Sequence, residues 1–391
     1  MKINSLQKIK NLSGKTVFLR VDFNVPIAGG KIKEDYRIKA GLETIKFLSA
    51  KGARLIIASH LGETDGSEAA FSLRPVAARL QALLKQPVRF LPVAIGLKTA
   101  AAVKTLKPGG IIMLENLRFN PGEYKNDLKF AASLAALADI YVNDAFSVCH
   151  RAQASVSAIK KYLPSYAGLL LEKELTALNK ILKPKLPLVV IMGGAKIRTK
   201  APLIAKLYPS ASQILIGGAL ANDFFKFQGF QIGKSISDDD SAPIIRKFFQ
   251  GNKLAAKIIL PRDVVVKTKD GRAQAVSPSA VKANDMILDI GPAAINDFAA
   301  HIKRANTLVW NGPLGKFEEA SFKHGTMAIA YLLAARSSGL AYGVIGGGET
   351  VEALNQTKMS EYIDWVSTGG GAMLAYLSGE KLPGLEKIVS F

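Results

Sequence analysis

The stretch LVVIMGGAK (Leu188–Lys196) joins an apolar run, suited to a buried strand, to a glycine-rich turn that carries a lysine. Four other runs in the second half of the chain end in a similar way: ILIGGALAN (Ile214–Asn222), LVWNGPLGK (Leu308–Lys316), YGVIGGGET (Tyr342–Thr350) and WVSTGGGA (Trp365–Ala372). Amphipathic segments of helical length alternate with such runs along the chain. This pattern predicts an α/β fold with doubly wound parallel sheets.

Strand-like runs in the first half end in charged or polar residues instead. These runs are VFLRVDFN (Val17–Asn24), LIIASH (Leu55–His60), IIMLENLR (Ile111–Arg118) and IYVNDAFSVCHR (Ile140–Arg151). Ligands of parallel α/β sheets bind at the carboxyl ends of the strands, so two kinds of strand end predict two kinds of ligand. Basic side chains suit a small, highly charged anion, whereas glycine-rich turns bring backbone N–H groups against nucleotide phosphates. The combination indicates phosphoryl transfer.

The length of the chain, 391 residues, exceeds that of one typical core and predicts two domains. Helices are predicted over Ile38–Ala50, Leu73–Leu84, Asp127–Leu137 and Leu169–Leu182. The last of these stops before Pro184 and Pro187, which disfavour continued helix. We therefore expect the domain junction here, with this helix as the connector.

The chain is strongly basic, with 52 Lys and Arg against 31 Asp and Glu and a net charge of +21. Such a charge attracts anions, and nucleic-acid binding is the alternative function that it suggests. Against this alternative, the basic residues are spread along the chain and do not alternate with aromatic ones. One cysteine, Cys149, leaves no intramolecular disulfide and indicates a reducing cytoplasm. No apolar stretch reaches the ~18 residues of a membrane span.

The segment GGAKIRTK (Gly193–Lys200) is the first candidate phosphate site. Lys196 and Lys200, four residues apart at the start of a helix, would project on one face beside its positive end. This arrangement suits a clamp for a phosphoryl group, and the alternative is a solvated basic turn. The segment Gly229–Ser235 looks like a P-loop but has one residue too few between its glycines, so we exclude it.

Two glycine triplets add further candidates. In GGGET (Gly346–Thr350), Glu349 is placed to hold Mg²⁺ and Thr350 to contact a phosphate oxygen. STGGGA (Ser367–Ala372) is the second triplet, and either one alone is also compatible with a simple tight turn. Three glycine-rich turns at strand ends within one domain favour a nucleotide site.

In the first half, basic residues at or just beyond strand ends form the candidate anion site, with polar partners for hydroxyl groups. The basic residues are Arg37, His60, Arg118 and Arg151, and the partners are Asp22 and Asn24. Each alone is equally compatible with a surface charge or a core histidine, but together they predict one site. A nucleophile paired with His150 is disfavoured, because Ser147 and Cys149 lie too near it in sequence to face it easily.

The chain resembles the phosphoglycerate kinase family over essentially its full length. The motifs that carry the resemblance are RVDFNVP (Arg20–Pro26), SHLG (Ser59–Gly62), LENLRF (Leu114–Phe119), NDAF..CHRAQAS (Asn143–Ser155), GGAKIRTK, GGALAN..F, DIGP (Asp289–Pro292), VWNGPLGKFE (Val309–Glu318), GGGET and STGGGA. The resemblance implies a monomeric glycolytic enzyme that transfers a phosphoryl group from 1,3-bisphosphoglycerate to ADP with Mg²⁺, giving 3-phosphoglycerate and ATP. It implies neither a nucleic-acid nor a membrane partner.

The resemblance also implies two similar-sized domains with a ligand cleft between them. Residues 1–170 would form the phosphoglycerate-binding domain, on which 373–391 packs back. Residues 171–185 would form the connecting helix and 186–372 the nucleotide-binding domain. Closure of the two domains would expel water from the reacting groups.

Site residues follow from the resemblance motif by motif. Asp22, Asn24, Arg37, His60, Arg118 and Arg151 would bind the phosphoglycerate. Lys196, Lys200, Gly217, Asn311, Glu318, Gly347, Gly348, Glu349, Thr350 and Val351 would bind the nucleotide, with Glu318 on the ribose and Glu349 on the metal. Arg37, Lys196, Gly370 and Gly371 would be catalytic and steady the transferred phosphoryl group. The acceptor is an already ionised carboxylate, so no general base is needed.

Three positions depart from the family pattern. Glu63-Thr64 stands where the family has Arg-Pro, Ser147 replaces a glycine, and Glu349 replaces an aspartate. A carboxylate facing the substrate phosphate would repel it, so we expect Glu63 to face solvent or to pair with a neighbouring Lys or Arg. Arg37, Arg118 and Arg151 would then hold the phosphate alone. On this reasoning, Glu63→Ala changes the KM for 3-phosphoglycerate less than about threefold.

Overall fold

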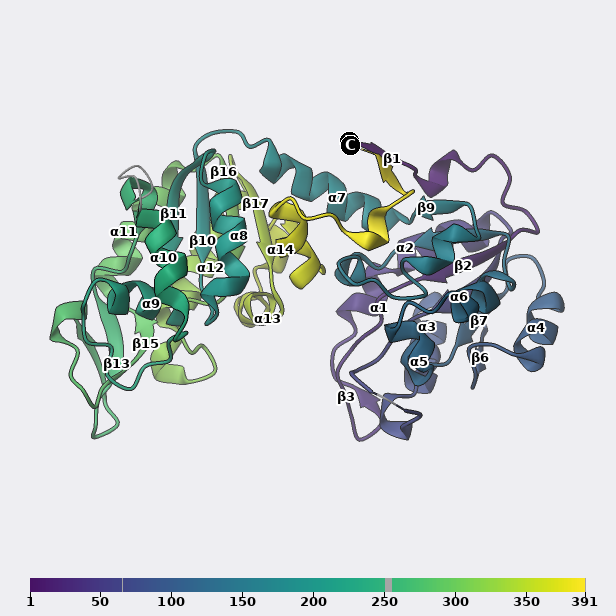
Figure 1. Cartoon of the computed structure of the whole chain (residues 1–391), viewed down its shortest axis with the longest axis horizontal. Coiled ribbons are helices and arrows are strands. Elements are labelled where there is room, and N and C mark those ends of the chain that lie inside the picture. The colour runs from purple at the N-terminus through teal and green to yellow at the C-terminus, as the bar shows by residue number, and fades with distance from the viewer. Residues whose placement is uncertain (65, 250–254, 391) are drawn as a thin grey trace. The chain divides into compact units, whose positions relative to one another are not determined.

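The structure, a computed structural model, describes residues 1–64, 66–249 and 255–390. It divides into two compact units, and Figure 1 labels the strands and helices of each. The N-terminal unit comprises Met1–Thr176 and Lys381–Phe391, and the C-terminal unit comprises Ala177–Glu380. Each contains one six-stranded sheet in the part of the chain that is described, which confirms the predicted α/β class.

The six strands of the N-terminal unit run parallel. In spatial order they are β6 (Val88–Leu91), β7 (Ile111–Leu114), β5 (Arg54–Ala58), β2 (Thr16–Arg20), β8 (Ile140–Asn143) and β9 (Ser165–Ala167). Two short antiparallel pairs accompany them: β1 (Lys2–Ile3) with β19 (Val389–Ser390), and β3 (Ile27–Ala28) with β4 (Lys31–Ile32).

The helices of this unit are α1 (Tyr36–Ala40), α2 (Leu42–Ala50), α3 (Arg74–Leu84), α4 (Leu97–Lys104), α5 (Pro121–Tyr124) and α6 (Leu128–Ala135). The expectation of one helix over Ile38–Ala50 is wrong, because the segment breaks at Gly41. A Cβ atom at Gly41 would lie 2.9 Å from the Phe23 ring, so any larger residue would force this ring to move. The α6 prediction is close, since Asp127 caps this helix by accepting a hydrogen bond from the Phe130 N–H at 2.7 Å.

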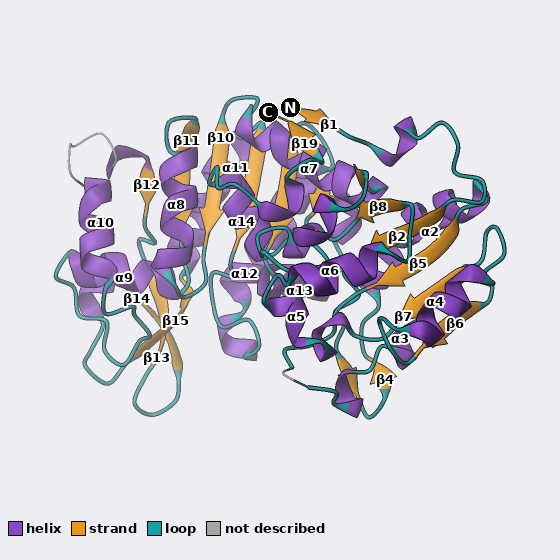
Figure 2. Cartoon of the chain, turned by 45° about the vertical axis from the view of Figure 1, so that its right-hand side comes forward, coloured by secondary structure: helices purple, strands orange, loops and turns teal. Residues whose placement is uncertain are grey.

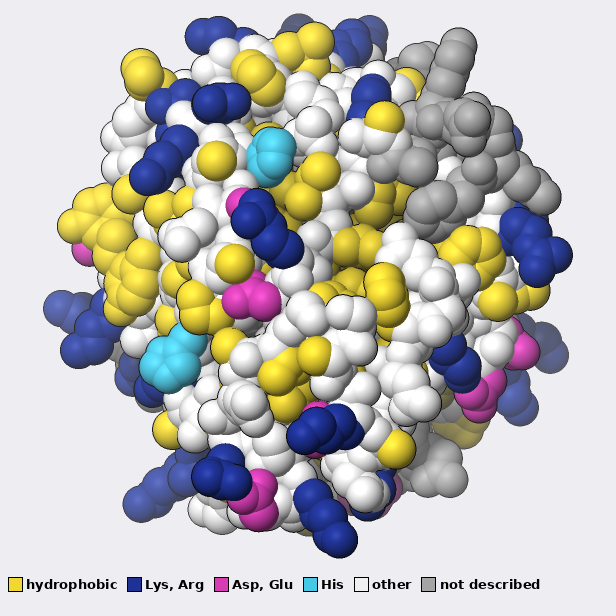
Figure 3. Space-filling model, turned by 90° about the vertical axis from the view of Figure 1, so that its left-hand side faces the viewer, with side chains coloured by type: hydrophobic (Ala, Val, Ile, Leu, Met, Phe, Trp, Pro, Cys, Tyr) yellow, Lys and Arg dark blue, Asp and Glu magenta, His cyan; other side chains and the backbone are white. Residues whose placement is uncertain are grey.

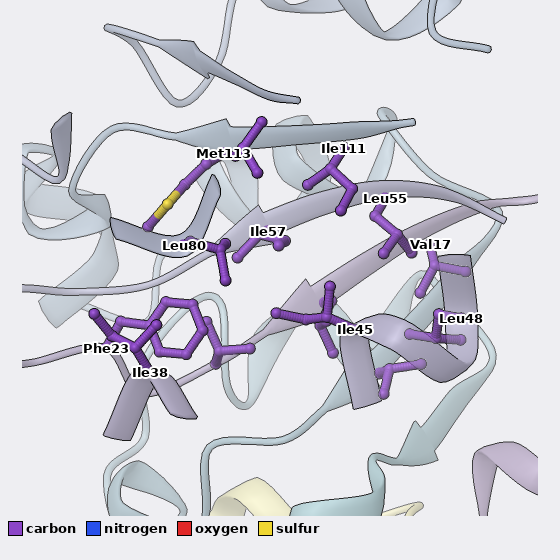
Figure 4. Packing of buried hydrophobic residues seen from close by; sticks show 14 of the residues in the cluster. Val17, Phe23, Ile38, Ile45, Leu48, Leu55, Ile57, Leu80, Ile111 and Met113 are labelled. Atoms are coloured by element: carbon purple, nitrogen blue, oxygen red, sulfur yellow. The ribbon is translucent and has the colours of Figure 1, made fainter. Parts of the chain in front are cut away.

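The N-terminal core lies between α1, α2 and α3 and one face of the sheet (Figure 4). Alternate residues of β2, such as Val17 and Leu19, belong to this cluster, together with Ile45 of α2 and Leu80 of α3. The intervening Phe18 is buried as well, so both faces of the strand are covered. Strands buried on both faces are typical of parallel sheets, which explains their nearly continuous apolar sequences.

The sheet of the C-terminal unit is also parallel throughout. Its spatial order is β12 (Ile258–Ile259), β11 (Ala211–Ile216), β10 (Leu188–Met192), β16 (Thr307–Asn311), β17 (Tyr342–Gly346) and β18 (Trp365–Val366). A smaller antiparallel sheet is formed by β14 (Ala273–Val276), β13 (Val264–Lys267) and β15 (Met286–Ile290).

Helices accompany these strands, as Figure 2 shows by colour. They are α8 (Ile197–Leu207), α9 (Ala219–Phe227), α10 (Ser241–Phe249), α11 (Pro292–Arg304), α12 (His324–Ser337), α13 (Gly348–Thr357) and α14 (Gly371–Leu377). Val189 and Ile191 of β10 share a core cluster with Phe298 of α11 and Leu333 of α12. The alternate residue Val190 is buried too, so this strand is likewise covered on both faces.

Helix α7 (Leu169–Leu182) has the bounds predicted from the sequence and passes from one unit into the other. Its first turn is capped by Asp144, whose Oδ1 accepts hydrogen bonds from the N–H groups of Leu170 and Leu171. The chain returns to the N-terminal unit at Lys381, compared with an expected return at 373. The difference arises because α14 packs against α8 of the C-terminal unit. Among the described residues, no helix is both long and apolar enough to cross a membrane.

Candidate functional site

The strand order brings the predicted anion-binding residues together. Strands β7, β5, β2 and β8 are consecutive neighbours and parallel, so their carboxyl ends form one edge of the sheet. Asp22 and Asn24 follow β2, His60 follows β5, Arg118 follows β7, and Arg151 lies beyond β8. Arg37 reaches this group from the start of α1. The structure therefore places all six predicted residues in the N-terminal unit, around the carboxyl edge of its sheet.

Asp22 is the centre of a hydrogen-bond network at this edge. Its Oδ2 accepts from the Arg37 guanidinium and from the Ser147 hydroxyl, and its Oδ1 accepts from the Asn24 N–H at 3.1 Å. Burial alone would raise the pKa of Asp22, but the charge of Arg37 and these hydrogen bonds lower it. Ser147, one of the expected departures from the family pattern, thus adds a donor that helps to keep Asp22 ionised.

His60 is buried, and its side chain lies between charged neighbours. Its Nδ1 is 3.9 Å from Asp22 Oδ1 and 3.3 Å from Arg20 Nη2. Burial lowers its pKa well below the usual value, and although Asp22 opposes this shift, Arg20 and Arg118 reinforce it. His60 is therefore neutral at physiological pH and suited to hydrogen bonding rather than to ion pairing.

Arg20 is not among the predicted site residues, although it is the first residue of the quoted motif RVDFNVP and lies at the end of β2. The side chain is fully buried and donates from Nε to Ser155 Oγ at 2.8 Å. Glu123, equally buried, lies 4.0 Å from Arg20 and accepts from the Ser155 hydroxyl. Arg20 of this pair also contacts His60, and the opposite charges together with these hydrogen bonds offset the cost of burying both groups.

Arg118 and Arg151 both contact Glu63. Glu63 Oε1 lies 3.1 Å from Nη1 of each arginine, and Oε2 accepts from the Tyr124 hydroxyl at 3.3 Å. As expected, Glu63 is largely exposed and pairs with neighbouring arginines. What the sequence did not indicate is that these partners are two of the residues expected to hold the phosphate.

The glycine-rich turns of the C-terminal unit also converge. Strands β11, β10, β16, β17 and β18 are consecutive neighbours, so the turns that follow them share the carboxyl edge of the second sheet. Two hollows open at this edge. One, of about 230 Å³, has mainly apolar walls from Val264, Ile287, Pro313 and Leu314, with Glu318 among its lining residues. The other, of about 390 Å³, is lined by Lys196, Lys200, Thr199, Asn311, Gly347, Gly348, Glu349, Thr350, Gly370 and Gly371, among others.

The two hollows share Gly194, Ala195 and Glu349 on their walls and are therefore neighbours. An apolar cavity beside a hollow lined with lysines and glycine N–H groups fits a nucleoside and its phosphates, respectively. The backbone must come very close at this point: a Cβ atom at Gly193 would lie 2.1 Å from the Pro313 carbonyl oxygen. Glycine is thus required at Gly193 by close packing of the two turns.

Lys200 is buried in the second hollow, where its Nζ donates to Asn311 Oδ1. Burial lowers the pKa of Lys200 to about 8, although Glu349 opposes the shift. Asn311 in turn donates from Nδ2 to the Gly346 carbonyl at 2.7 Å and so fixes the glycine triplet. Lys196, at the N-terminus of α8, is exposed by contrast.

Some predicted nucleotide residues have other contacts. Thr350 is fully buried, and its hydroxyl oxygen accepts the Gly312 N–H at 2.7 Å, which fixes the turn after β16. Val351 packs against the hydrophobic core. Gly217 does not line either hollow. A Cβ atom at Gly217 would lie 2.7 Å from the Leu314 side chain, so this glycine allows close packing against Leu314.

Asp289 is a lining residue that the sequence did not single out, although it begins the quoted DIGP motif. It accepts hydrogen bonds from the N–H groups of Gly325 at 2.8 Å and Ile290 at 2.9 Å. Burial raises its pKa to about 7, in spite of these hydrogen bonds. The sequence shows Asp289 three residues before Pro292, the first residue of α11. This local pattern marks the start of a helix, but it does not reveal that Asp289 is buried.

Magnesium is the metal that the family resemblance implies. Within the described ranges, no cluster of three or more His, Cys, Asp or Glu side chains is suited to hold a metal ion. Proteins bind Mg²⁺ through one or two carboxylates together with substrate phosphates, and do not require such a cluster. Glu349 is exposed and borders both hollows, so it fits as the one protein carboxylate for an ion that arrives with the nucleotide.

The face of the molecule drawn in Figure 3 gives little support to the nucleic-acid alternative. On the face drawn in Figure 3, Lys and Arg side chains lie at separate points, with acidic side chains among them. A binder of single strands needs a continuous basic groove with aromatic side chains for base stacking.

Comparison with known proteins gives the family. The family model described as phosphoglycerate kinase matches residues 6–380. The phosphoglycerate kinase of Moorella thermoacetica is 43% identical over 380 residues, which cover 96% of each chain. That of Caulobacter vibrioides (strain NA1000 / CB15N) is 43% identical over 387 residues, covering 97% of this chain and 98% of the other.

A solved structure of phosphoglycerate kinase from Coxiella burnetii is similar with a TM-score of 0.86 and 38% identity, covering 99% of each chain. These matches give no support to a nucleic-acid-binding protein. The chain belongs to the phosphoglycerate kinase family, the glycolytic phosphotransferases that convert 1,3-bisphosphoglycerate and ADP into 3-phosphoglycerate and ATP.

Proposed function

We propose that the N-terminal unit binds the phosphoglycerate and that the C-terminal unit binds the nucleotide. The observation that carries this division is the strand order, which gathers basic side chains at one carboxyl edge and glycine-rich turns at the other. The phosphate of the glycerate contacts Arg118 and Arg151, while Asp22 and Asn24 serve its hydroxyl group. Arg37 and neutral His60 complete the site.

The nucleotide lies with its base and ribose in the apolar cavity, where Glu318 contacts the ribose. Its phosphates occupy the hollow lined by Lys196, Lys200 and the glycine triplets. Mg²⁺, held by Glu349 and the phosphates, supplies charge neutralisation for the transferred group.

Phosphoryl transfer in this site requires positioning of the two substrates and electrostatic stabilisation of the transferred group, but no proton transfer by a side chain. The acceptor is an ionised carboxylate in one direction and a phosphate oxygen in the other, so no side chain has to remove a proton. Lys196 and the N–H groups of Gly370 and Gly371 neutralise charge on the phosphoryl group, and Arg37 adds a guanidinium from the other unit. Direct transfer therefore requires both units to act on one phosphoryl group, and we propose a closing movement for this step. We further propose that the enzyme acts as a monomer in the cytoplasm, which suits its single, buried cysteine.

A coupled assay of ATP formation, with and without Mg²⁺, tests the activity itself. For the division between units, Arg151→Ala should raise the KM for 3-phosphoglycerate more than about tenfold, the effect of losing one charge-assisted hydrogen bond. Calorimetric ADP affinity should stay unchanged. Arg79→Ala, which removes an exposed arginine paired with Asp35, is the matched control and should leave both quantities unaltered. Lost ADP binding in Arg151→Ala would overturn the assignment.

A further inference from the structure

We propose that Glu63 is an internal anion that occupies the phosphate-binding arginines of the unliganded protein and that the substrate phosphate must displace. This inference rests on the proposed phosphoglycerate site and assigns Glu63 control of substrate affinity there. Glu63 Oε1 is 3.1 Å from Nη1 of Arg118 and 3.1 Å from Nη1 of Arg151. One carboxylate oxygen thus bridges two guanidinium groups, much as a phosphate oxygen would.

Arg118 shows that this internal contact is incomplete. Its side chain is only 1% exposed, yet among the described residues its Nε and Nη2 atoms have no hydrogen-bond partner. Buried donors without partners are costly, so Arg118 favours an anion with more acceptor atoms than a carboxylate. A carboxylate offers two oxygens and one charge, whereas a phosphate monoester offers three terminal oxygens and up to two charges. A phosphate therefore offers the two arginines more acceptor atoms and more charge than Glu63 does.

The surroundings allow Glu63 to leave without unfolding its loop. Its side chain is 70% exposed, so it can turn into solvent. The backbone on either side is fixed. The Gly62 N–H donates to Asn24 Oδ1 at 2.9 Å, and the Thr64 N–H donates to the Tyr124 hydroxyl at 3.4 Å. Exchange of one anion for another then needs only a rotation of the Glu63 side chain.

Displacement has two measurable consequences. Binding of 3-phosphoglycerate has to break the ion pairs of Glu63 with Arg118 and Arg151. The affinity for 3-phosphoglycerate is therefore lower than it would be if both arginines were free of Glu63. Added salt weakens the broken pairs as well as the new ones, which makes binding less sensitive to ionic strength than in a protein without the internal anion. The second consequence distinguishes displacement from a merely structural role of Glu63.

The test is calorimetric binding of 3-phosphoglycerate to the full-length protein at several salt concentrations. Glu63→Gln keeps the shape and removes the charge, and Glu63→Ala removes the contact altogether. Both should tighten the Kd about 3- to 30-fold, the range expected when two ion pairs no longer compete. This replaces the change of less than about threefold that the sequence predicts, because Glu63 pairs with the two arginines proposed to hold the phosphate. Both should also give a steeper dependence of Kd on salt and an unchanged affinity for MgADP. Thermal unfolding confirms that the variants are folded.

Glu43→Gln is the matched control, since Glu43 is an exposed carboxylate of the same unit that pairs with Lys173. An equal gain of affinity in this control would show that the effect comes from the change in net charge of the protein, and this would overturn the proposal. An unchanged or weaker Kd in both Glu63 variants would overturn it as well. If the wild type binds 3-phosphoglycerate and Arg151→Ala does not, the proposed phosphoglycerate site is supported, independently of the results for the Glu63 variants. If Arg151→Ala binds normally, the site assignment itself is wrong.

Discussion

Replacement of Lys200 by methionine should change the pH dependence of stability of the C-terminal unit. Lys200 is buried, and burial lowers its pKa from 10.5 to about 8. The unfolded chain, with the ordinary pKa, therefore binds more protons than the folded chain between these two values. The free energy of unfolding of the wild type therefore rises with pH between these two values. Below about pH 8, Lys200 is charged in both states, and burial of this charge lowers the free energy of unfolding by its full amount. Between about pH 7 and about pH 10 the gain is about 2.5 kcal/mol.

The assay is urea unfolding followed by tryptophan fluorescence at both pH values. The chain has two tryptophans, Trp310 and Trp365, and both lie in the C-terminal unit, so the signal reports that unit alone. Lys200→Met keeps the apolar stem but lacks the titrating group. Its unfolding free energy should therefore gain about 2.5 kcal/mol less than that of the wild type. Other titrating groups are shared by the two proteins and cancel in the comparison.

Lys206→Met provides the control, because Lys206 lies exposed on the same helix, and it should follow the wild type. Lys200→Met should also lose most affinity for ADP, whose phosphates we place beside Lys200. Parallel pH profiles for wild type and Lys200→Met would refute the reasoning, since the lysine would then carry no penalty in the folded state.

Four further substitutions, at three positions, test the proposed catalytic and metal-binding groups. Lys196→Ala should lower turnover by roughly 10²-fold or more, the scale of losing one transition-state donor, and a raised nucleotide KM with unchanged kcat would exclude this role. Arg37→Ala should lower kcat while calorimetric ADP affinity stays intact, because Arg37 lies on the other unit; loss of ADP binding would contradict it. Glu349→Asp should keep activity and shift the Mg²⁺ optimum, whereas Glu349→Ala should depress activity strongly. An active Ala variant with the same metal requirement would place the ion elsewhere.

The sequence alone determined the class of fold and the chemistry of the strand ends. Apolar runs, glycine turns and proline breaks are local signals, and their physical causes act within a few residues. Helix α7 was therefore predicted with its bounds, Leu169–Leu182. The break at Gly41 was missed, and the close approach of the Phe23 ring to Gly41 could not be predicted, because it depends on packing between residues distant in sequence.

Tertiary structure decided which of these strand ends meet and what their side chains contact. Glu63 lies far along the chain from Arg118 and Arg151, and no local pattern indicates that all three share one contact. Burial of Lys200 and the buried pair of Arg20 with Glu123 likewise depend on packing between elements. Residue types set the charges that are available, but distance and desolvation set the interaction between charges, and both are properties of the folded chain.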